Sequence, residues 1–287
     1  MKGLIKRSLS GIVYVAIIVA GILCGNMAFS CLLFLLGITA TIEFSGLMST
    51  QKDTTRLTTS LDVIGTITMI AGFIAANLLN TSSIAWCFLT IYILYLIARL
   101  VSQLYLPRLN AIHSLAYSFL GQIYIALPLS LMTLLYGRCG TPHLVLAMFI
   151  MIWLNDTGAF VVGSLMGRHK LFPRISPKKS WEGFWGGVVF AIAAGILFGT
   201  CFSDYFNITG TWKLALAGAI VALFATWGDL VESLIKRTLG VKDSGNLIPG
   251  HGGILDRIDS LLLVAPAMVV YLVIVEYIAP ITINYLF

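Results

Sequence analysis

The chain has 287 residues, of which 59% are hydrophobic and only 10% are charged, with a mean hydropathy of +0.95. A soluble domain carries about 25% charged residues, so this composition excludes a water-soluble globular protein and indicates that lipid surrounds most of the chain. The net charge of +6 is better explained by basic cytoplasmic loops than by a nucleic-acid surface, and we expect no nucleic-acid partner.

The apolar runs predict an all-α, polytopic membrane helix bundle, because a spanning helix needs about 20 mostly apolar residues. The chain contains nine such runs, near residues 8–25, 28–48, 61–79, 84–105, 112–136, 143–164, 183–202, 212–235 and 255–279. The least certain boundary lies between the first two, where only residues 24–27 separate them. No cleavage site follows the first run, which we interpret as a membrane helix. The five cysteines are scattered without a CxxC pair, which argues against disulfides and a cysteine metal site.

The basic residues set the expected orientation. With the N-terminus inside, 16 of the 18 lysines and arginines fall in cytosolic segments, and only Arg138 and Lys213 do not. Because lysine and arginine collect on the cytoplasmic side, this bias predicts an N-terminus inside and a C-terminus outside.

The acidic residues divide the chain into two parts. Residues 1–140 hold three acids, whereas residues 156–259 hold eight, together with the two longest polar loops, 165–182 and 236–253. We therefore expect residues 1–140 to form a transmembrane scaffold and residues 141–287 to carry the chemistry. Glu43, near the cytosolic end of the second run, is interpreted as a snorkelling surface acid.

Four aspartates lie inside the predicted helices, where carboxylates are costly and usually functional. They are Asp156, Asp229, Asp256 and Asp259. At 1.5 Å rise per residue, each lies within about 12 Å of the cytosolic end of its helix, so they are expected to share one layer. Clustered carboxylates repel unless they are protonated or bridged by a cation, and oxygen-only ligands favour Mg²⁺. The alternative is structural pairing of these acids with Arg257, Lys236 or backbone groups.

The two polar loops have the composition of phosphate-binding segments. Gly, Pro and Ser favour tight turns with exposed N–H groups, and Gly252 and Gly253 lead into a helix N-terminus, which favours anions. The candidate substrate-binding residues of these loops and the adjoining helices are Asn155, Asp156, Ser176, Lys178, Lys179, Ser233, Arg237, Lys242, Asp243, His251, Gly252 and Gly253. The ordinary alternative for a basic loop is attraction to an anionic leaflet.

Three sequence blocks resemble the signature of the phosphatidate cytidylyltransferase (CDP-diacylglycerol synthase) family. They are Ser176-Pro-Lys178-Lys179-Ser180-Trp-Glu182-Gly183, Asn155-Asp156, and the stretch from Ser233-Leu-Ile-Lys236-Arg237 through Lys242-Asp243 to Pro249-Gly-His251-Gly252-Gly253-Ile-Leu-Asp256-Arg257-Ile-Asp259. The resemblance covers residues 150–260 by motif and leaves residues 1–140 without a counterpart.

The resemblance implies an enzyme that makes CDP-diacylglycerol and pyrophosphate from CTP and phosphatidic acid. It implies a homodimer in a bacterial inner membrane, in contact with membrane lipid, with the active site facing the cytosol. It implies Mg²⁺, with Mn²⁺ as an alternative, held by Asp229, Asp256 and Asp259, and allows a K⁺ nearby. Asp229, Asp256, Asp259, Lys236 and Arg257 would form the catalytic set. The rival hypotheses are an ion-coupled transporter and a related enzyme such as a CTP-dependent polyprenol kinase or an archaeal lipid cytidylyltransferase.

Overall fold

The computed structural model describes residues 2–50, 54–78, 82–106, 109–139, 141–206, 210–245 and 252–278. The chain forms two compact units. The first unit comprises residues 1–137 and 238–258, and the second comprises residues 138–237 and 259–287. The segment that contains the long second polar loop therefore groups with the N-terminal helices.

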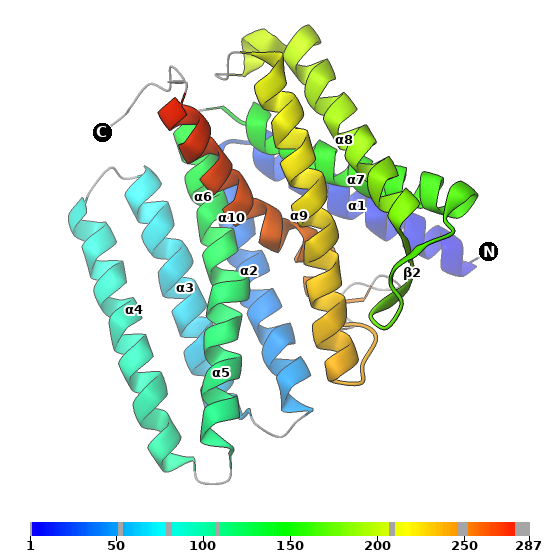
Figure 1. Cartoon of the computed structure of the whole chain (residues 1–287). Helices are drawn as coiled ribbons and strands as arrows, with labels where there is room; N and C mark the ends of the chain where they lie inside the picture. Colours follow the sequence, from blue (N-terminus) through cyan, green and yellow to red (C-terminus); the bar gives the residue numbers. More distant parts are fainter. Residues whose placement is uncertain are drawn as a thin grey trace. The chain divides into compact units, whose positions relative to one another are not determined.

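The first unit is built from apolar helices, which satisfy their own backbone hydrogen bonds and so can lie in lipid. In chain order it contains α1 (Lys2–Leu23), α2 (Asn26–Ser49), α3 (Arg56–Leu78), α4 (Ser82–Ser102), a 3₁₀ turn (Gln103–Tyr105), α5 (Ala111–Gly121), a π-helical turn (Gln122–Ala126) and α6 (Leu127–Cys139). Helix α3 packs against both α2 and α4 (Figure 1). The break between α1 and α2 falls at Gly25, whose φ of 105° turns the chain where the sequence left the boundary uncertain.

A buried polar cluster joins α3, α4 and α5 in the first unit. Arg99 is completely buried, and its Nε lies 3.6 Å from Asp62 Oδ1 and 2.7 Å from Ser118 Oγ. Ser118 Oγ donates to Asp62 Oδ2, and Tyr95 Oη donates to Asp62 Oδ1. Arg99 is thus part of the helix packing, although the charge analysis counted it among the cytosolic residues.

The second unit combines four long helices with a β-hairpin. It contains α7 (His143–Met166), β1 (Lys170–Phe172), β2 (Ser176–Ser180), α8 (Trp181–Cys201), a 3₁₀ turn (Ser203–Tyr205), α9 (Thr211–Thr238) and α10 (Leu255–Ile278), with α10 beginning in the first unit. The antiparallel strands pair Lys170 with Ser180 and Phe172 with Ser176, with an irregularity between these pairs. The hairpin links α7 to α8 (Figure 1).

Small residues let α7 and α8 approach each other closely, as is common for helices in lipid. A Cβ at Gly187 of α8 would lie 2.8 Å from the backbone oxygen of Asn155, and a Cβ at Gly186 would lie 3.0 Å from that of Gly158. This packing fixes Asn155 and Asp156 on a rigid helix next to the hairpin.

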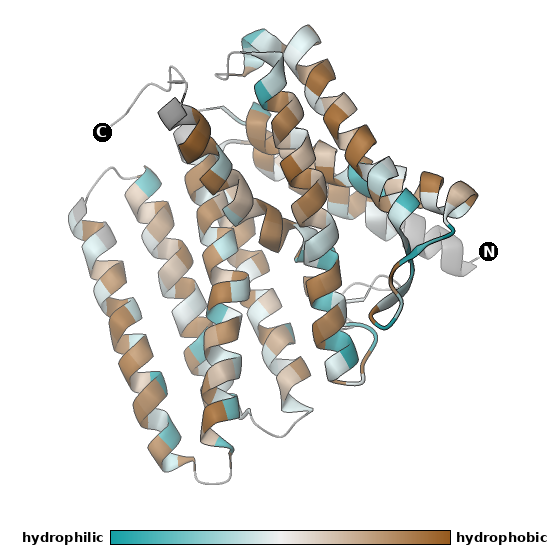
Figure 2. Ribbon diagram, in the orientation of Figure 1, coloured by the Kyte–Doolittle hydropathy of each residue, from teal (hydrophilic) through white to brown (hydrophobic). Residues whose placement is uncertain are grey.

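The predicted all-α membrane bundle is confirmed in its main features. Eight helical segments of the described ranges are long and apolar enough to span a membrane, and α1 adds a shorter apolar stretch, Ser10–Leu23. Figure 2 shows hydrophobic residues along most of the helices, with hydrophilic residues on the hairpin. The hairpin itself was not predicted, since its segment was expected to be a loop. The N-inside, C-outside orientation stays a prediction.

Candidate active site

A cavity of about 430 Å³ in the second unit brings together residues from α7, the hairpin, α8 and α9. Its lining includes the charged side chains of Asp156, Lys178, Lys179 and Asp229. The lining also includes apolar side chains, among them the aromatic rings of Phe160 and Phe184. The volume falls in the range of small-molecule sites, and the combination of charged and apolar side chains suits an amphipathic ligand.

The hairpin that carries the two lysines is held at its base. Glu182, in the first turn of α8, accepts hydrogen bonds from the backbone N–H groups of Arg168 and His169, and its Oε1 lies 2.6 Å from His169 Nδ1. Ser180 caps α8, because its Oγ accepts the N–H of Gly183 at 3.1 Å. A serine cap with an acid in the first helical turn is a strong helix-start signal. The cap also fixes the end of β2, the strand that carries Lys178 and Lys179.

Lys179 forms the main polar contact of the cavity. Its Nζ lies 2.7 Å from Asp229 Oδ2 and 3.4 Å from the backbone oxygen of Thr226. The other carboxylate oxygen of Asp229 accepts a hydrogen bond of 3.2 Å from Ser233 Oγ, one turn further along α9. The structure therefore brings three predicted site residues, Lys179, Asp229 and Ser233, into one hydrogen-bonded chain.

Three of the four predicted aspartates converge in the second unit. Asp156 of α7, Asp229 of α9 and Asp259 of α10 interact electrostatically with one another, and Lys179 is their shared counter-charge. Gly228 lets α10 approach α9 at this point, since a Cβ there would lie 2.6 Å from the backbone oxygen of Asp259. Asn155 is 1% exposed, and its Oδ1 has no hydrogen-bond partner among the described residues, as is typical of an atom reserved for a ligand or water.

The donor chemistry of these residues suits a hard cation, because carboxylate oxygens are the ligands that Mg²⁺ prefers. Within the described ranges, however, no group of three or more His, Cys, Asp or Glu side chains is already arranged around a metal position. The predicted set of metal ligands therefore stays a prediction. Its carboxylates in the second unit are close enough to interact, and Lys179 is paired with Asp229.

Asp256, the remaining predicted aspartate, organises the turn that leads into α10 in the first unit. Its Oδ2 accepts hydrogen bonds from Ser244 N, Ser244 Oγ and Gly253 N, each at 2.9 Å. Gly252 has a φ of 80°, a conformation that favours glycine. The predicted glycines thus serve a backbone requirement, while the role of Asp256 as a metal ligand stays a prediction.

Sequence reasoning missed Glu43 of α2. Its carboxylate accepts the N–H groups of Ile254 at 3.0 Å and Leu255 at 2.9 Å, so it caps α10. The interpretation of Glu43 as a snorkelling acid is therefore wrong, and the N–H groups at the start of α10, expected to attract a phosphate, bind a carboxylate of the chain itself. The sequence held only a weak signal, an acid near the end of an apolar run.

The other predicted basic residues occupy different environments. Lys236 is buried and its Nζ lies 2.8 Å from Glu232 Oε2, one turn earlier in α9. Arg237 Nε donates to the backbone oxygen of Ile175 in the hairpin at 3.5 Å. The backbone oxygen of Arg257 accepts a hydrogen bond of 2.9 Å from Tyr14 Oη of α1.

Of the remaining predicted residues, Ser176 opens β2, Lys242 and Asp243 are exposed, and His251 lies outside the described residues. The predicted catalytic and binding roles of all these side chains stay predictions.

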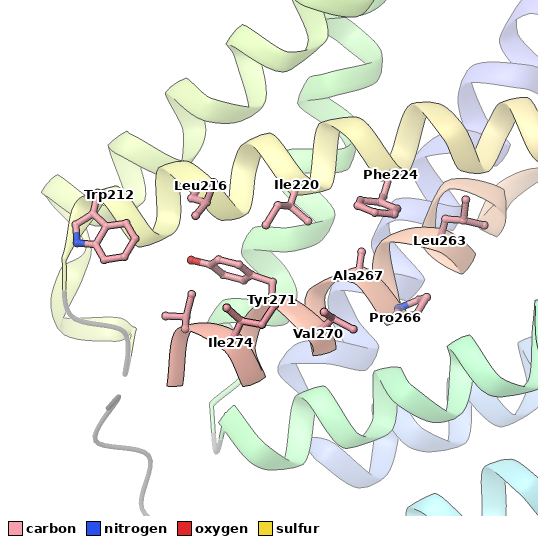
Figure 3. A pocket seen from close by; sticks show the side chains of 11 residues that line it. Trp212, Leu216, Ile220, Phe224, Leu263, Pro266, Ala267, Val270, Tyr271 and Ile274 are labelled. Carbon is pink, nitrogen blue, oxygen red and sulfur yellow. The ribbon is translucent and has the colours of Figure 1, made fainter. Parts of the chain in front are cut away.

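A second, larger cleft of about 590 Å³ lies between α9 and α10 and is lined almost entirely by apolar side chains (Figure 3). Trp212, Ile220 and Phe224 face Ala267 and Val270 across it. None of the predicted site residues lines this cleft. The charged cavity is therefore the better candidate for the chemistry, although it is the smaller of the two.

Together, the apolar helices and the charged cavity define an integral membrane protein with a candidate site that combines charged and apolar side chains. The chain belongs to the cytidylyltransferase family, whose sequence profile matches residues 5–275. It is 48% identical over 131 residues to a phosphatidate cytidylyltransferase of Staphylococcus haemolyticus, a match that covers 46% of this chain and 49% of the relative.

Similar relatives carry the same name in two other species. The Staphylococcus epidermidis protein is 46% identical over 129 residues, covering 45% of this chain and 48% of the relative. The Staphylococcus aureus protein is 47% identical over 131 residues, covering 46% and 49%. The chain thus spans about half the length of the curated relatives it matches.

Proposed function

We propose that this protein transfers the cytidylyl group of CTP to phosphatidic acid, giving CDP-diacylglycerol and pyrophosphate. The observation that carries the proposal is the cavity whose lining combines Lys178, Lys179, Asp156 and Asp229 with apolar side chains. Such a cavity can hold phosphate groups beside the start of a lipid tail. The name of the relatives supports the same reaction.

The reaction we propose is a direct displacement at phosphorus. An oxygen of the phosphatidate phosphate forms a bond to the α-phosphorus of CTP, the bond from that phosphorus to the β-phosphate oxygen breaks, and pyrophosphate leaves with the electron pair. The nucleophile is already anionic, so no general base is needed. The protein must hold two anionic substrates together and neutralise developing charge.

The two lysines of β2 are the natural phosphate ligands of this cavity. Lys178 is exposed and lines the cavity, whereas Lys179 is partly buried against Asp229. Their placement on a short strand with a fixed base limits their movement and so positions the bound phosphates. Asp156 and the unpartnered Oδ1 of Asn155 would orient the polar end of the ligand.

A divalent cation, Mg²⁺ or Mn²⁺, fits the donor chemistry of the predicted aspartates, and Asp229, Asp256 and Asp259 would hold it. It would supply charge neutralisation at the phosphate oxygens and the leaving group. We also propose that the cavity faces the cytosol in a bacterial inner membrane, and that the protein forms a homodimer.

The test is an assay of the purified chain in detergent with phosphatidic acid, Mg²⁺ and each ribonucleoside triphosphate in turn. We expect pyrophosphate release with CTP that requires phosphatidic acid, together with a CDP-lipid product. Asp229→Asn is the matched inactive variant. Absence of pyrophosphate with every nucleotide would refute the proposal, and transfer of a terminal phosphate to a lipid alcohol would indicate a kinase instead.

A further inference from the structure

We propose that Glu43 is a positioning residue that holds the Asp256 turn in its working shape. This inference rests on the proposed function, because it assigns Glu43 to the same reaction. Glu43 lies in α2, more than 200 residues before the turn, in the half of the sequence that carries no motif of the family.

The contacts of Glu43 reach the start of α10 and Ser244. Oε1 accepts the N–H of Ile254 at 3.0 Å, and Oε2 accepts that of Leu255 at 2.9 Å. Oε2 also lies 3.5 Å from Ser244 Oγ, the hydroxyl that donates to Asp256 Oδ2 at 2.9 Å. One carboxylate therefore holds the first N–H groups of α10, and the neighbouring N–H of Gly253 donates to Asp256 Oδ2 at 2.9 Å, so the backbone that Glu43 holds also positions Asp256.

Two glycines pack closely against the Glu43 carboxylate. A Cβ at Gly245 would lie 2.8 Å from Glu43 Oε1, and a Cβ at Gly253 would overlap Glu43 Oε2 and Ser244 Oγ. Glycines that the sequence suggested for phosphate approach thus make room for a carboxylate of the chain. The fit is too close for Glu43 to be a surface acid whose position is incidental.

The chemistry of the contact requires two acceptor oxygens. Two neighbouring N–H groups point at Glu43, and an ionised carboxylate can accept from both. A glutamine has one acceptor oxygen and an NH₂ group, so one backbone N–H would face another donor. An aspartate keeps both acceptors on a side chain shorter by one methylene. The two substitutions therefore separate the loss of acceptor chemistry from a change of length.

The first measurement compares Glu43→Gln and Glu43→Asp with Thr41→Val in the purified chain. Thr41 is the matched control, because it lies in α2 two residues away, is 2% exposed, and makes its side-chain contact with Thr66 at 2.9 Å instead of with the turn. Loss of a supporting residue of a metal or phosphate site typically costs about 10- to 100-fold.

We expect Glu43→Gln to lower kcat by that factor and to raise the Mg²⁺ concentration for half-maximal rate. Glu43→Asp should recover part of the loss, and Thr41→Val should keep kcat within about twofold at a similar change of melting temperature. A folded Glu43→Gln protein with the kcat of the wild type would overturn the proposal. An equal loss of kcat in Thr41→Val would do the same.

The second measurement does not depend on activity. Hydrogen exchange at the Ile254 and Leu255 amides should be about tenfold faster or more in Glu43→Gln than in Thr41→Val, because hydrogen bonds to a charged acceptor are among the stronger ones. If the wild type lacks CTP-dependent activity, the proposed function fails while this readout still judges Glu43. Unchanged exchange at both amides would overturn the positioning role.

Ser244→Ala covers the case in which Glu43→Gln does not fold. It removes the hydroxyl between the two carboxylates while leaving Glu43 and its two N–H contacts in place. We expect Ser244→Ala to lower kcat, as Glu43→Gln does, while the protein stays fully folded. A Ser244→Ala protein with wild-type kcat and an unchanged Mg²⁺ requirement would contradict the need to hold Asp256 in place, on which the role of Glu43 depends.

Discussion

Two lysine–carboxylate pairs in the second unit have nearly equal lengths but opposite environments, and this difference predicts different effects of the same substitution. Lys179 lies 2.7 Å from Asp229, and Lys236 lies 2.8 Å from Glu232. The first pair has side chains 26% and 40% exposed, whereas those of the second are 10% and 2% exposed. The Coulomb attraction at these distances is similar, so burial decides the cost of breaking each pair.

We expect Lys179→Met to leave stability almost unchanged and to damage catalysis. A solvent-accessible pair contributes about 0.2–1 kcal/mol, so the loss of folding free energy should stay within that range. A charged contact to a phosphate contributes about 1.5–3 kcal/mol, which corresponds to a fall in kcat/KM of about 10- to 150-fold.

We expect Lys236→Met to lower the free energy of unfolding much more than Lys179→Met does. Loss of Lys236 leaves Glu232 buried without its partner, and breaking a buried pair from one side costs about 3–5 kcal/mol. The double variant Glu232→Gln/Lys236→Met should recover part of that loss, since no charge is then left unpaired.

Stability and activity are measured on the same preparations. Thermal unfolding in detergent gives the stability, and CTP-dependent pyrophosphate release gives kcat/KM. Equal destabilisation by Lys179→Met and Lys236→Met would refute the argument from burial. Wild-type kcat/KM in Lys179→Met would refute the assignment of this lysine to substrate phosphates.

Three further predictions concern other parts of the chain. Asp256→Asn should abolish CTP-dependent activity while the protein stays folded and inserted, and wild-type turnover would remove Asp256 from the metal set. Arg99→Met should destabilise the first unit by about 3–5 kcal/mol, because it leaves Asp62 buried and unpaired; its folded fraction should keep normal specific activity. A variant whose single cysteine is the exposed Cys201 should be labelled by an impermeant thiol reagent in intact cells, whereas a variant whose single cysteine is Ser176→Cys should be labelled only after lysis, and the opposite pattern would invert the proposed orientation.

The long helices could be predicted closely because lipid imposes both their length and their apolar composition. The run predicted at 143–164 is observed as His143–Met166, and the run predicted at 212–235 as Thr211–Thr238. The β-hairpin could not be predicted in this way. Its strands are short and rich in lysine, proline and serine, and they are stabilised by contacts with Glu182 that local sequence patterns do not reveal.

The sequence predicted which residues belong to the candidate site, but not which of them contact one another. An acid inside an apolar run costs free energy, so Asp156, Asp229 and Asp259 stood out. Which lysine would neutralise them depends on how the hairpin folds back over α9, and Lys179 lies 50 positions before Asp229. The contacts of Glu43 could not be predicted from local sequence, because the N–H groups that it accepts lie more than 200 positions away.

The charges of the cavity explain why substrate and cation would have to arrive together. Asp156, Asp229 and Asp259 interact electrostatically with one another, and Lys179 is a counter-charge common to them. A nucleotide triphosphate would add further negative charge to these carboxylates and would be repelled by them. A divalent cation reverses the sign of the local field and frees Lys179 to contact phosphate. The carboxylates alone make the cavity unfavourable for anions. As ligands of a cation, the same carboxylates would allow anions to bind, which gives a physical reason for aspartates in the proposed site.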